Sequence, residues 1–485
     1  MTALLTVAPL LGLIAMVMSA SHLLPIAVSL ANGDGVAGRF ALSMGVNFAI
    51  GLLLWLATRG YQRDLKARDA ILLVVLAWAG GAAFATVPLL LTIPGLSPTD
   101  AYFEAMSGLT TTGATTLTGL DQLPPAVNVW RTFLVWLGGM GLIVLAVAIL
   151  PLVGVGGRQI YKAETPGPMK DTRLTPRITE TAKGLWLVYA AISVACLLAM
   201  KLAGMSWLDA LMHAFSTMGL GRFSSHDANF AYFGSPAIEA VTILFMLAAG
   251  INFATHFLAW REKSPAAYRR DPEAGTFLLI TAASCVGVAL YLRALGVYPD
   301  FLTALRFASF NVVSLATTTG FSNTDYGSWP VFAPLWMLFL TSFASCSGST
   351  GGGIKMIRAK LLYLQVYREF VKLLHPTAAT PLKINGQPVE NKIVFAVLAF
   401  SFVYVASIVS MTLILTLSGL DVLSAFSAVV ACINNAGPGL HQVGPATTYA
   451  GLSDFQTWVC TFAMLLGRLE LFTLLIVFTP IFWRK

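Results

Sequence analysis

The sequence predicts an all-α integral membrane protein, in which an N-terminal pair of helices is followed by four similar units. Its 485 residues are 57% hydrophobic and only 11% charged, whereas a soluble protein carries roughly a quarter charged residues. Many apolar runs reach about 20 residues, which is long enough to cross the hydrocarbon core of a bilayer as a helix. A short turn of small and polar residues also recurs at matched places between these runs. Composition, run length and repetition therefore agree on the fold class.

The apolar runs predict about ten membrane crossings, of which the eighth is interrupted. The first run has no basic n-region and is followed at once by another apolar run, so we interpret it as a retained helix rather than a signal peptide. The predicted crossings are residues 3–30, 37–58, 70–94, 127–152, 184–204, 236–260, 275–295, 330–370, 391–418 and 455–483. Shorter apolar stretches, which cannot span a bilayer, are residues 101–111, 208–218, 303–316 and 422–433.

The distribution of charge predicts the orientation of these helices. Most of the 30 lysine and arginine residues follow the second, fourth, sixth and eighth crossings, and cytoplasmic loops of membrane proteins carry an excess of such residues. Both termini should then be cytoplasmic, and the four short stretches should enter the membrane from outside as half-helices. Orientation explains the net charge of +8 better than nucleic-acid binding does, so no nucleic-acid partner is expected. Three interpretations remain for the basic loops 158–183 and 355–392: they dock a partner, they contact anionic membrane lipid, or they serve only as topology signals.

Repetition predicts how the chain is divided. Each unit reads as a helix, a half-helix, a polar turn and a returning helix, and the four turns align without gaps over seven residues. Regular units of this kind indicate a repeat architecture, and repeats in membrane transport proteins commonly surround a shared path. We therefore expect four parallel helix–pore-hairpin–helix repeats around a central pore. The predicted parts are an N-terminal transmembrane hairpin (1–60) and pore repeats 61–157, 158–262, 263–375, with the interrupted second helix, and 376–485.

The turns span residues 107–113, 216–222, 314–320 and 431–437, and their seventh positions are Gly113, Arg222, Gly320 and Gly437. Glycine accepts a positive φ without a Cβ clash, so successive carbonyl groups can face a common axis. The half-helices would point their partly negative C-terminal ends inward. Rings of carbonyl oxygens can replace the water shell of a cation. The turns therefore predict a filter for a weakly hydrated cation such as K⁺. Glu104 and Asn311, at matching places before two turns, either brace the filter or are simply buried polar groups.

A second glycine-rich stretch interrupts the eighth crossing. Its four glycines are Gly348, Gly351, Gly352 and Gly353. Glycine costs about 1 kcal/mol relative to alanine within a helix, so we expect an irregular loop beneath the filter that narrows the path; a kink without a gating role is the alternative. Arg468, deep in the last crossing, is expected to donate to carbonyls of this loop and to form an inner barrier. A purely structural ion pair is the alternative for Arg468.

These turns, the glycine-rich break and the extra N-terminal hairpin resemble the superfamily of Trk, Ktr and HKT potassium transporters, most of all its bacterial TrkH branch, over essentially the whole chain. The resemblance implies potassium uptake across the bacterial inner membrane by a homodimer, with a cytoplasmic TrkA-type nucleotide-binding regulatory subunit. No phosphate-binding motif is present in this chain, so nucleotide control would need that other subunit. By resemblance, the K⁺-binding positions are Thr111, Thr112, Leu220, Gly221, Thr318, Thr319, Asn435 and Ala436.

One position departs from the family pattern. Relatives have glycine at the seventh position of the second turn, where this chain has Arg222. A guanidinium beside a cation filter should repel the ion. Three interpretations follow: the side chain faces the outer vestibule, the register shifts so that Gly221 takes the role, or transport is impaired.

Two other classes of function are weighed against potassium uptake. A Na⁺- or H⁺-coupled secondary cation transporter is the alternative, although such carriers usually show inverted repeats and midplane carboxylates. A membrane-embedded enzyme would need a clustered nucleophile, base or set of metal ligands inside the bilayer. The sequence suggests no such cluster, so we do not expect an enzyme.

Overall fold

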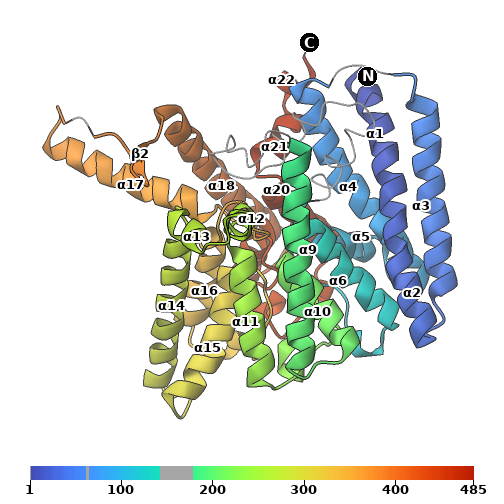
Figure 1. Cartoon of the computed structure of the whole chain (residues 1–485), viewed down its shortest axis with the longest axis horizontal. Helices are drawn as coiled ribbons and strands as arrows, with labels where there is room; N and C mark the ends of the chain where they lie inside the picture. Colours follow the sequence, from blue (N-terminus) through green and yellow to red (C-terminus); the bar gives the residue numbers. More distant parts are fainter. Residues whose placement is uncertain (1, 62–64, 142–177, 379, 485) are drawn as a thin grey trace.

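The protein is almost entirely helical (Figure 1) in a computed structural model that describes residues 2–61, 65–141, 178–378 and 380–484. Within these residues, six helices are long and apolar enough to cross a membrane, and two further pairs of helices would each make a bent span. The chain termini lie at the same end of the molecule (Figure 1). A single two-stranded antiparallel sheet, with Lys383 opposite Pro388, is the β structure of the described part. The expectation of a mostly helical membrane protein is confirmed.

The elements fall into an N-terminal segment and four units. The N-terminal segment contains α1 (Thr2–Ser19), η1 (Ala20–His22), α2 (Leu23–Asn32) and α3 (Ala37–Thr58). The first unit contains α4 (Ala67–Thr92), α5 (Pro98–Leu109), η2 (Leu120–Gln122) and α6 (Pro125–Gly139). The second unit contains α9 (Ile178–Leu202), α10 (Trp207–Gly219), η4 (Asn229–Tyr232), α11 (Pro236–Gly250), α12 (Phe253–Glu262) and α13 (Ala266–Arg270).

The third and fourth units repeat the same order of elements. The third unit contains α14 (Ala274–Ala294), α15 (Phe301–Ala316), η5 (Tyr326–Ser328), α16 (Phe332–Phe343) and α17 (Met356–Leu374). The fourth unit contains β1 (Lys383–Ile384), β2 (Gln387–Pro388), α18 (Asn391–Leu417), α19 (Val422–Ile433), η6 (His441–Val443), η7 (Tyr449–Gly451), α20 (Asp454–Arg468), α21 (Phe472–Leu475), η8 (Ile476–Phe478) and α22 (Pro480–Trp483). Each unit therefore has a long helix, a short helix, a turn and a returning helix.

The short helices α5, α10, α15 and α19 begin in the same way. A serine or aspartate precedes each of them and accepts a hydrogen bond from the backbone N–H three residues later. Such a cap satisfies one of the free N–H groups at a helix start and stabilises it by about 1 kcal/mol. The capping residues are Ser97, Ser206, Asp300 and Asp421. The observed helices match the short apolar stretches predicted from the sequence to within a few residues.

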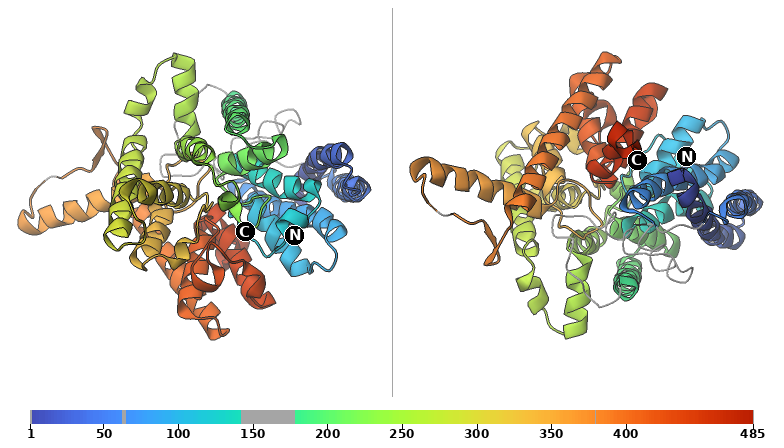
Figure 2. Two further views of the ribbon diagram at one scale, coloured as in Figure 1. Left: turned by 90° about the horizontal axis from the view of Figure 1, so that it is seen from below. Right: turned by 90° about the horizontal axis from the view of Figure 1, so that it is seen from above.

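The four units close into a ring. The returning helix of each unit packs on the short helix of the next one: α6 on α10, α11 on α15, α16 on α19, and α20 on α5. In the two end-on views of Figure 2 the units follow one another around the middle of the molecule, from cyan through green and yellow to red. The N-terminal helices pack outside this ring, against α4 and α6. Ring closure brings the four polar turns together.

Apolar side chains occupy two different surroundings. One buried cluster joins the N-terminal segment to the first and fourth units, and a second joins the second and third units. Large apolar side chains such as Leu53, Leu279 and Phe402 instead point outward. An exposed apolar belt on long helices is what a lipid-facing surface requires.

Two predicted crossings are wrong as continuous helices. Residues 236–260 form α11 and α12, which meet at 94°, and residues 455–483 begin as α20 and turn by 112° into α21 and η8. Asn252 is the N-cap of α12, because its side chain accepts a hydrogen bond from the Ala254 N–H. The interruption predicted for 330–370 is present, since α16 ends at Phe343 and α17 begins at Met356. Crossing 127–152 begins as α6, and its residues from 142 on lie outside the described part.

Candidate filter and intramembrane loop

The four turns share one backbone conformation that the sequence analysis did not anticipate. The fifth residue of each turn is in the left-handed region, although none of the four is glycine. These residues are Thr111 (φ 59°), Leu220 (φ 55°), Thr318 (φ 62°) and Asn435 (φ 51°). A non-glycine residue in this region costs roughly 1–2 kcal/mol, and such strain gathers at functional sites. The same strained position, repeated four times, marks the turns as the candidate site.

Hydrogen bonds to the end of each short helix fix this conformation. In every turn the N–H of the sixth residue donates to the carbonyl of the first, and the N–H of the fifth donates to the carbonyl of the second. The hydrogen bonds from the sixth residue to the first measure 2.9 Å (Thr112 to Ser107), 2.9 Å (Gly221 to Ser216), 2.8 Å (Thr319 to Ser314) and 2.8 Å (Ala436 to Ala431). They satisfy carbonyl groups that a helix C-terminus otherwise leaves free. The turn is therefore a property of the helix end.

The seventh position follows the expectation in three of the four turns. Gly113, Gly320 and Gly437 have φ of 74°, 82° and 89°. Arg222 does not adopt a positive φ, and Leu220 holds the left-handed fifth position of its turn. The second turn therefore keeps the register of the others, and the suggested shift to Gly221 is not observed.

The turns touch one another in sequence around the ring. A Cβ built on Gly437 would lie 2.6 Å from the Thr112 carbonyl oxygen, and one on Gly221 would lie 3.0 Å from that of Thr111. Carbonyl oxygens of the fifth and sixth positions thus lie at the contacts between turns. The eight candidate K⁺-binding residues are all buried: Thr111, Thr112, Leu220, Gly221, Thr318, Thr319, Asn435 and Ala436.

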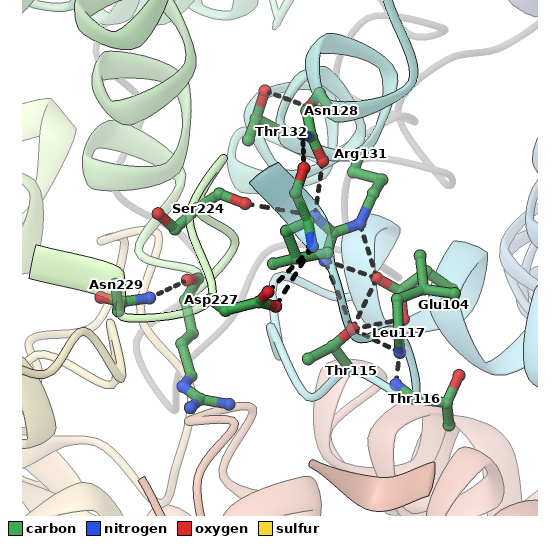
Figure 3. A network of polar contacts seen from close by, with 12 residues as sticks. Glu104, Thr115, Thr116, Leu117, Asn128, Arg131, Thr132, Ser224, Asp227 and Asn229 are labelled. Carbon is green, nitrogen blue, oxygen red and sulfur yellow. Dashed lines mark hydrogen bonds and ion pairs between the residues drawn. The ribbon is translucent and has the colours of Figure 1, made fainter. Parts of the chain in front are cut away.

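A buried ion pair braces the first turn (Figure 3). Glu104 accepts hydrogen bonds from Arg131 Nε at 2.7 Å and from Thr115 Oγ1 at 3.0 Å. Arg131 Nη1 also donates to the Ser224 carbonyl of the second unit at 3.2 Å, so the pair ties two units together. Its guanidinium lies 4.3 Å from the centre of the Phe223 ring. These contacts are compatible with bracing, one of the two interpretations given for Glu104, whereas Arg131 was not identified from the sequence.

Equivalent braces stand behind two other turns. His213, three residues before the second turn like Glu104 before the first, has Nε2 2.9 Å from Ser224 Oγ. Asn311 holds the same place in the third unit and donates to Asn323 Oδ1 at 2.7 Å. His213 was missed from the sequence, although the alignment of the four turns already placed it beside Glu104 and Asn311. Polar residues at one aligned position were the available signal.

The intramembrane loop, residues 344–355, lies directly against the third to fifth residues of three turns. The Gly352 N–H donates to Thr318 Oγ1 at 2.9 Å, and Thr350 Oγ1 donates to the Met218 carbonyl at 2.9 Å. A Cβ on Gly351 would lie 3.0 Å from the Thr317 carbonyl oxygen, and one on Gly352 would collide with that of Asn434. Side chains at these two positions would push the loop away from the turns. The expected irregular loop is present, and glycine is required for its close approach.

The ends of the loop are held by groups that the sequence analysis did not single out. The Glu273 carboxylate accepts hydrogen bonds from the N–H groups of Ser347 at 3.0 Å, near the start of the loop, and of Ile357 at 2.8 Å, just after its end. Lys355 Nζ donates to the Gly351 carbonyl. The other two glycines of the loop, Gly348 and Gly353, have positive φ. Gly348 packs against the Asn252 side chain, and Gly353 packs against the carbonyl oxygens of Thr341 and Ser342.

Arg468 joins the loop to the first turn. Its Nη1 donates to the Thr350 carbonyl at 3.3 Å and to Thr111 Oγ1 at 3.4 Å. Its Nη2 donates to the carbonyls at the end of α6, with 3.2 Å to that of Gly139. Glu470, close in sequence, pairs with Arg358 at 2.6 Å. Arg468 therefore lies where the loop, a turn and a helix end meet, and donates to a loop carbonyl as expected.

An acidic cluster with one histidine lies between the first two units, at the start of α10 and at η2. His226 contacts Asp121 at 2.5 Å and Asp209 at 3.2 Å. Burial disfavours the charged ring, but the two carboxylates outweigh it and raise the pKa of His226 above its ordinary value. Burial of Asp121 is likewise outweighed, because hydrogen bonds from His226 and from the Asp227 N–H lower the pKa of Asp121. Among the described residues, no group of three or more His, Cys, Asp or Glu could hold a metal ion.

The chain is similar to known transport proteins over nearly its whole length. Residues 38–485 match the family model TrkH, described as a cation transport protein. Two relatives named Trk system potassium uptake protein TrkH are 46% identical (Halomonas elongata) and 44% identical (Vibrio parahaemolyticus), each over 98% of both chains. The crystal structure of the potassium transporter TrkH from Vibrio parahaemolyticus superposes with a TM-score of 0.89 at 41% identity, covering 100% of this chain and 99% of that one. The chain therefore belongs to the TrkH family of cation transport proteins.

Proposed function

We propose that this protein carries out potassium uptake as the membrane component of a Trk system. The single observation that carries the proposal is the left-handed residue repeated at the fifth position of four turns that touch one another. Strain of this kind persists only where surrounding structure enforces it. The names of the relatives, potassium uptake proteins at 43–46% identity, support the same ion.

The filter is proposed to consist of backbone oxygens rather than charged side chains. The fifth and sixth residues of the four turns coordinate K⁺ through their carbonyl groups, and the seventh residues (Gly113, Arg222, Gly320, Gly437) form the outer bend. Carbonyl oxygens replace the hydration shell of the ion. The C-terminal ends of α5, α10, α15 and α19, which carry partial negative charge, add to the attraction. Neutral carbonyl oxygens bind the ion strongly enough for it to enter the filter and weakly enough for it to leave.

The division of the chain follows from the same proposal. Repeats 61–157, 158–262, 263–375 and 376–485 surround a central pore, with the hairpin 1–60 outside. The ring of contacts from α6 to α10, α11 to α15, α16 to α19 and α20 to α5 supports this arrangement. Both termini lie at one end of the molecule, which supports a location on the same side of the membrane. The lysine- and arginine-rich loops favour the cytoplasmic side of a bacterial inner membrane.

The intramembrane loop and Arg468 are proposed to be the gate. The loop contacts the second, third and fourth turns, and Arg468 fastens the loop to the first turn and to α6. A positive charge in this place opposes the passage of a cation until the loop moves. A homodimer and a TrkA-type regulatory subunit on the basic cytoplasmic face are proposed as partners, since this chain supplies no nucleotide-binding motif.

Uptake of labelled Rb⁺ into proteoliposomes tests the proposal. Purified protein should load the vesicles with Rb⁺, unlabelled K⁺ should compete strongly, and Na⁺ should compete weakly. Empty vesicles are the control. Uptake that Na⁺ and K⁺ suppress equally would contradict a potassium filter. Uptake that proceeds only with an imposed Na⁺ or H⁺ gradient would favour the coupled carrier instead.

A further inference from the structure

The backbone of Arg222 lies where the first and third turns approach the second. Arg222 is the seventh residue of the second turn, and Cβ atoms built on the first and third turns, at Gly113 and Gly320, would lie 2.6 and 3.2 Å from its own Cβ. Its carbonyl accepts a hydrogen bond from Asn229 Nδ2 at 3.2 Å, which anchors its backbone within the second unit. The side chain therefore leaves the ring between the turns of both neighbouring units.

The side chain ends at the unit on the opposite side of the ring. Its Nη2 donates to the Pro445 carbonyl at 2.5 Å. Pro445 lies between η6 and η7 of the fourth unit, after the fourth turn, and the order of contacts around the ring places the fourth unit opposite the second. A side chain that starts in one of these units and ends in the other crosses the outer mouth of the ring.

The charge of Arg222 is poorly balanced compared with that of its neighbour Arg131. Arg131 pairs with the Glu104 carboxylate at 2.7 Å. The Arg222 guanidinium instead donates to a neutral carbonyl, and within the described part of the chain its Nε has no hydrogen-bond partner. The residue is only 7% exposed. Little water screens this charge, so it acts on nearby ions more strongly than a surface arginine would.

We propose that Arg222 is a cationic bar across the outer mouth of the filter, which weakens the entry of monovalent cations and excludes divalent cations. The inference rests on the proposed function. The proposal combines two of the three interpretations of Arg222: the side chain faces the outer vestibule, and its charge affects transport. The bar sets affinity and selectivity by charge, because the electrostatic energy of an ion at the mouth is proportional to its own charge.

This proportionality gives a quantitative signature. A unit charge about 8–10 Å from an ion, at an effective dielectric constant of about 20–80, changes the binding of a monovalent ion by roughly 2- to 30-fold. If removing the charge lowers the apparent KM for K⁺ by a factor f, the inhibition constant of an external divalent ion should fall by about f². If Arg222 only linked the two units structurally, the change in the divalent inhibition constant would not be the square of the change in KM.

The experiment compares Arg222→Gln with Arg222→Lys in proteoliposomes, using Rb⁺ uptake and external Ba²⁺ as the divalent probe. The glutamine variant should show a lower apparent KM for K⁺ and a Ba²⁺ inhibition constant lowered by the square of that factor. The lysine variant keeps the charge and should remain close to the parent protein in both constants. Unchanged constants in Arg222→Gln, or equal factors for the two ions, would overturn the proposal.

A modification made after folding covers the case in which Arg222→Gln does not fold. Arg222→Cys is treated with a cationic and with a neutral methanethiosulfonate reagent of similar size. The five native cysteines are buried, so treated parent protein is the control. The cationic adduct should raise both constants toward the parent values and the neutral adduct should not; equal effects of the two reagents would refute the bar. If the parent protein itself carries no K⁺, the proposed function fails, independently of the role of Arg222.

Discussion

The first and third turns differ from the second and fourth in sequence but not in backbone. The first and third read Thr-Thr-Thr-Gly, and in both the outer two threonine hydroxyls of the three lie within hydrogen-bond distance, at 2.8 and 2.7 Å. The second and fourth turns have Leu220 and Asn435 at the left-handed position. All four keep the same pair of hydrogen bonds to the end of a short helix. The helix end therefore sets the path of the backbone, and side chains are left to differ in chemistry.

The braces behind the turns show the same contrast, and breaking them should give the largest effect. The first turn has a buried ion pair, Glu104–Arg131, whereas the third has the neutral pair Asn311–Asn323. Glu104→Ala leaves a buried guanidinium without its partner and should reduce the free energy of unfolding by about 3–5 kcal/mol. Asn311→Ala leaves a buried amide unpaired and should reduce it by about 1–3 kcal/mol.

Thermal unfolding in detergent measures both losses. The double variant Glu104→Gln with Arg131→Met is the matched control, because it removes both charges and should lose less stability than Glu104→Ala alone. Equal losses for Glu104→Ala and Asn311→Ala would show that the two braces are equivalent despite their different charge.

The glycine at the seventh position can be tested against a glycine of equal backbone strain. Gly113 and Gly119 have φ of 74° and 72°, but a Cβ on Gly113 would collide with the Arg222 backbone nitrogen, while one on Gly119 would meet nothing within 4 Å. Both alanine variants should lose about 1–2 kcal/mol from the positive φ. Gly113→Ala should in addition lower Rb⁺ uptake by more than about tenfold, since about 1.4 kcal/mol already corresponds to that factor. Equal uptake by the two variants would contradict close contact between turns.

The gate differs from the filter because it uses a charge rather than neutral oxygens. Arg468→Ala removes the guanidinium beneath the first turn and should raise Rb⁺ flux by about 2- to 10-fold, because one unit of positive charge no longer opposes the ion. Arg468→Lys keeps the charge and should stay near the parent rate. Monodisperse Arg468→Ala protein with unchanged or lower flux would remove Arg468 from the gate.

The smallest effect is expected at His226 of the second unit, which contacts Asp121 of the first unit and Asp209 of its own unit. Because the pKa of His226 is raised on folding, its contribution to stability is full below the unfolded pKa, about 6.5, and is lost as pH rises through the folded pKa. The pKa of Asp121 is lowered, so its contribution is lost only as pH falls below about 4.

The contact should therefore be strongest between about pH 4 and 6.5. His226→Gln should lower the free energy of unfolding by about 0.2–1 kcal/mol at pH 6 and by less at pH 9. Substitution of the exposed His375 is the control. A loss that does not change with pH would mean that charge plays no part in this contact.

The sequence alone determined the membrane class, the four short helices and the glycine-rich break, because these depend on local composition and on a pattern that repeats along the chain. It also placed the turns in register, since Thr-Thr-Thr-Gly occurs twice at matched places. The sharp bends after Gly250 and Arg468 were not predicted, because the apolar runs continue across them. A single glycine at each place, Gly250 and Gly467, is a weak signal, since single glycines such as Gly45 also occur inside unbroken helices.

Only the tertiary structure decided which groups meet. Glu273 holds both ends of a loop that begins more than 70 residues later, and Arg222 reaches Pro445 from the opposite unit. The left-handed Leu220 has no signal in residue type, and Asn435 has only the modest tendency of asparagine toward this region. The hydrogen bonds of the helix end and the contact with neighbouring turns impose the conformation of both. Local patterns follow from the residues themselves, whereas these contacts exist only once the ring has closed.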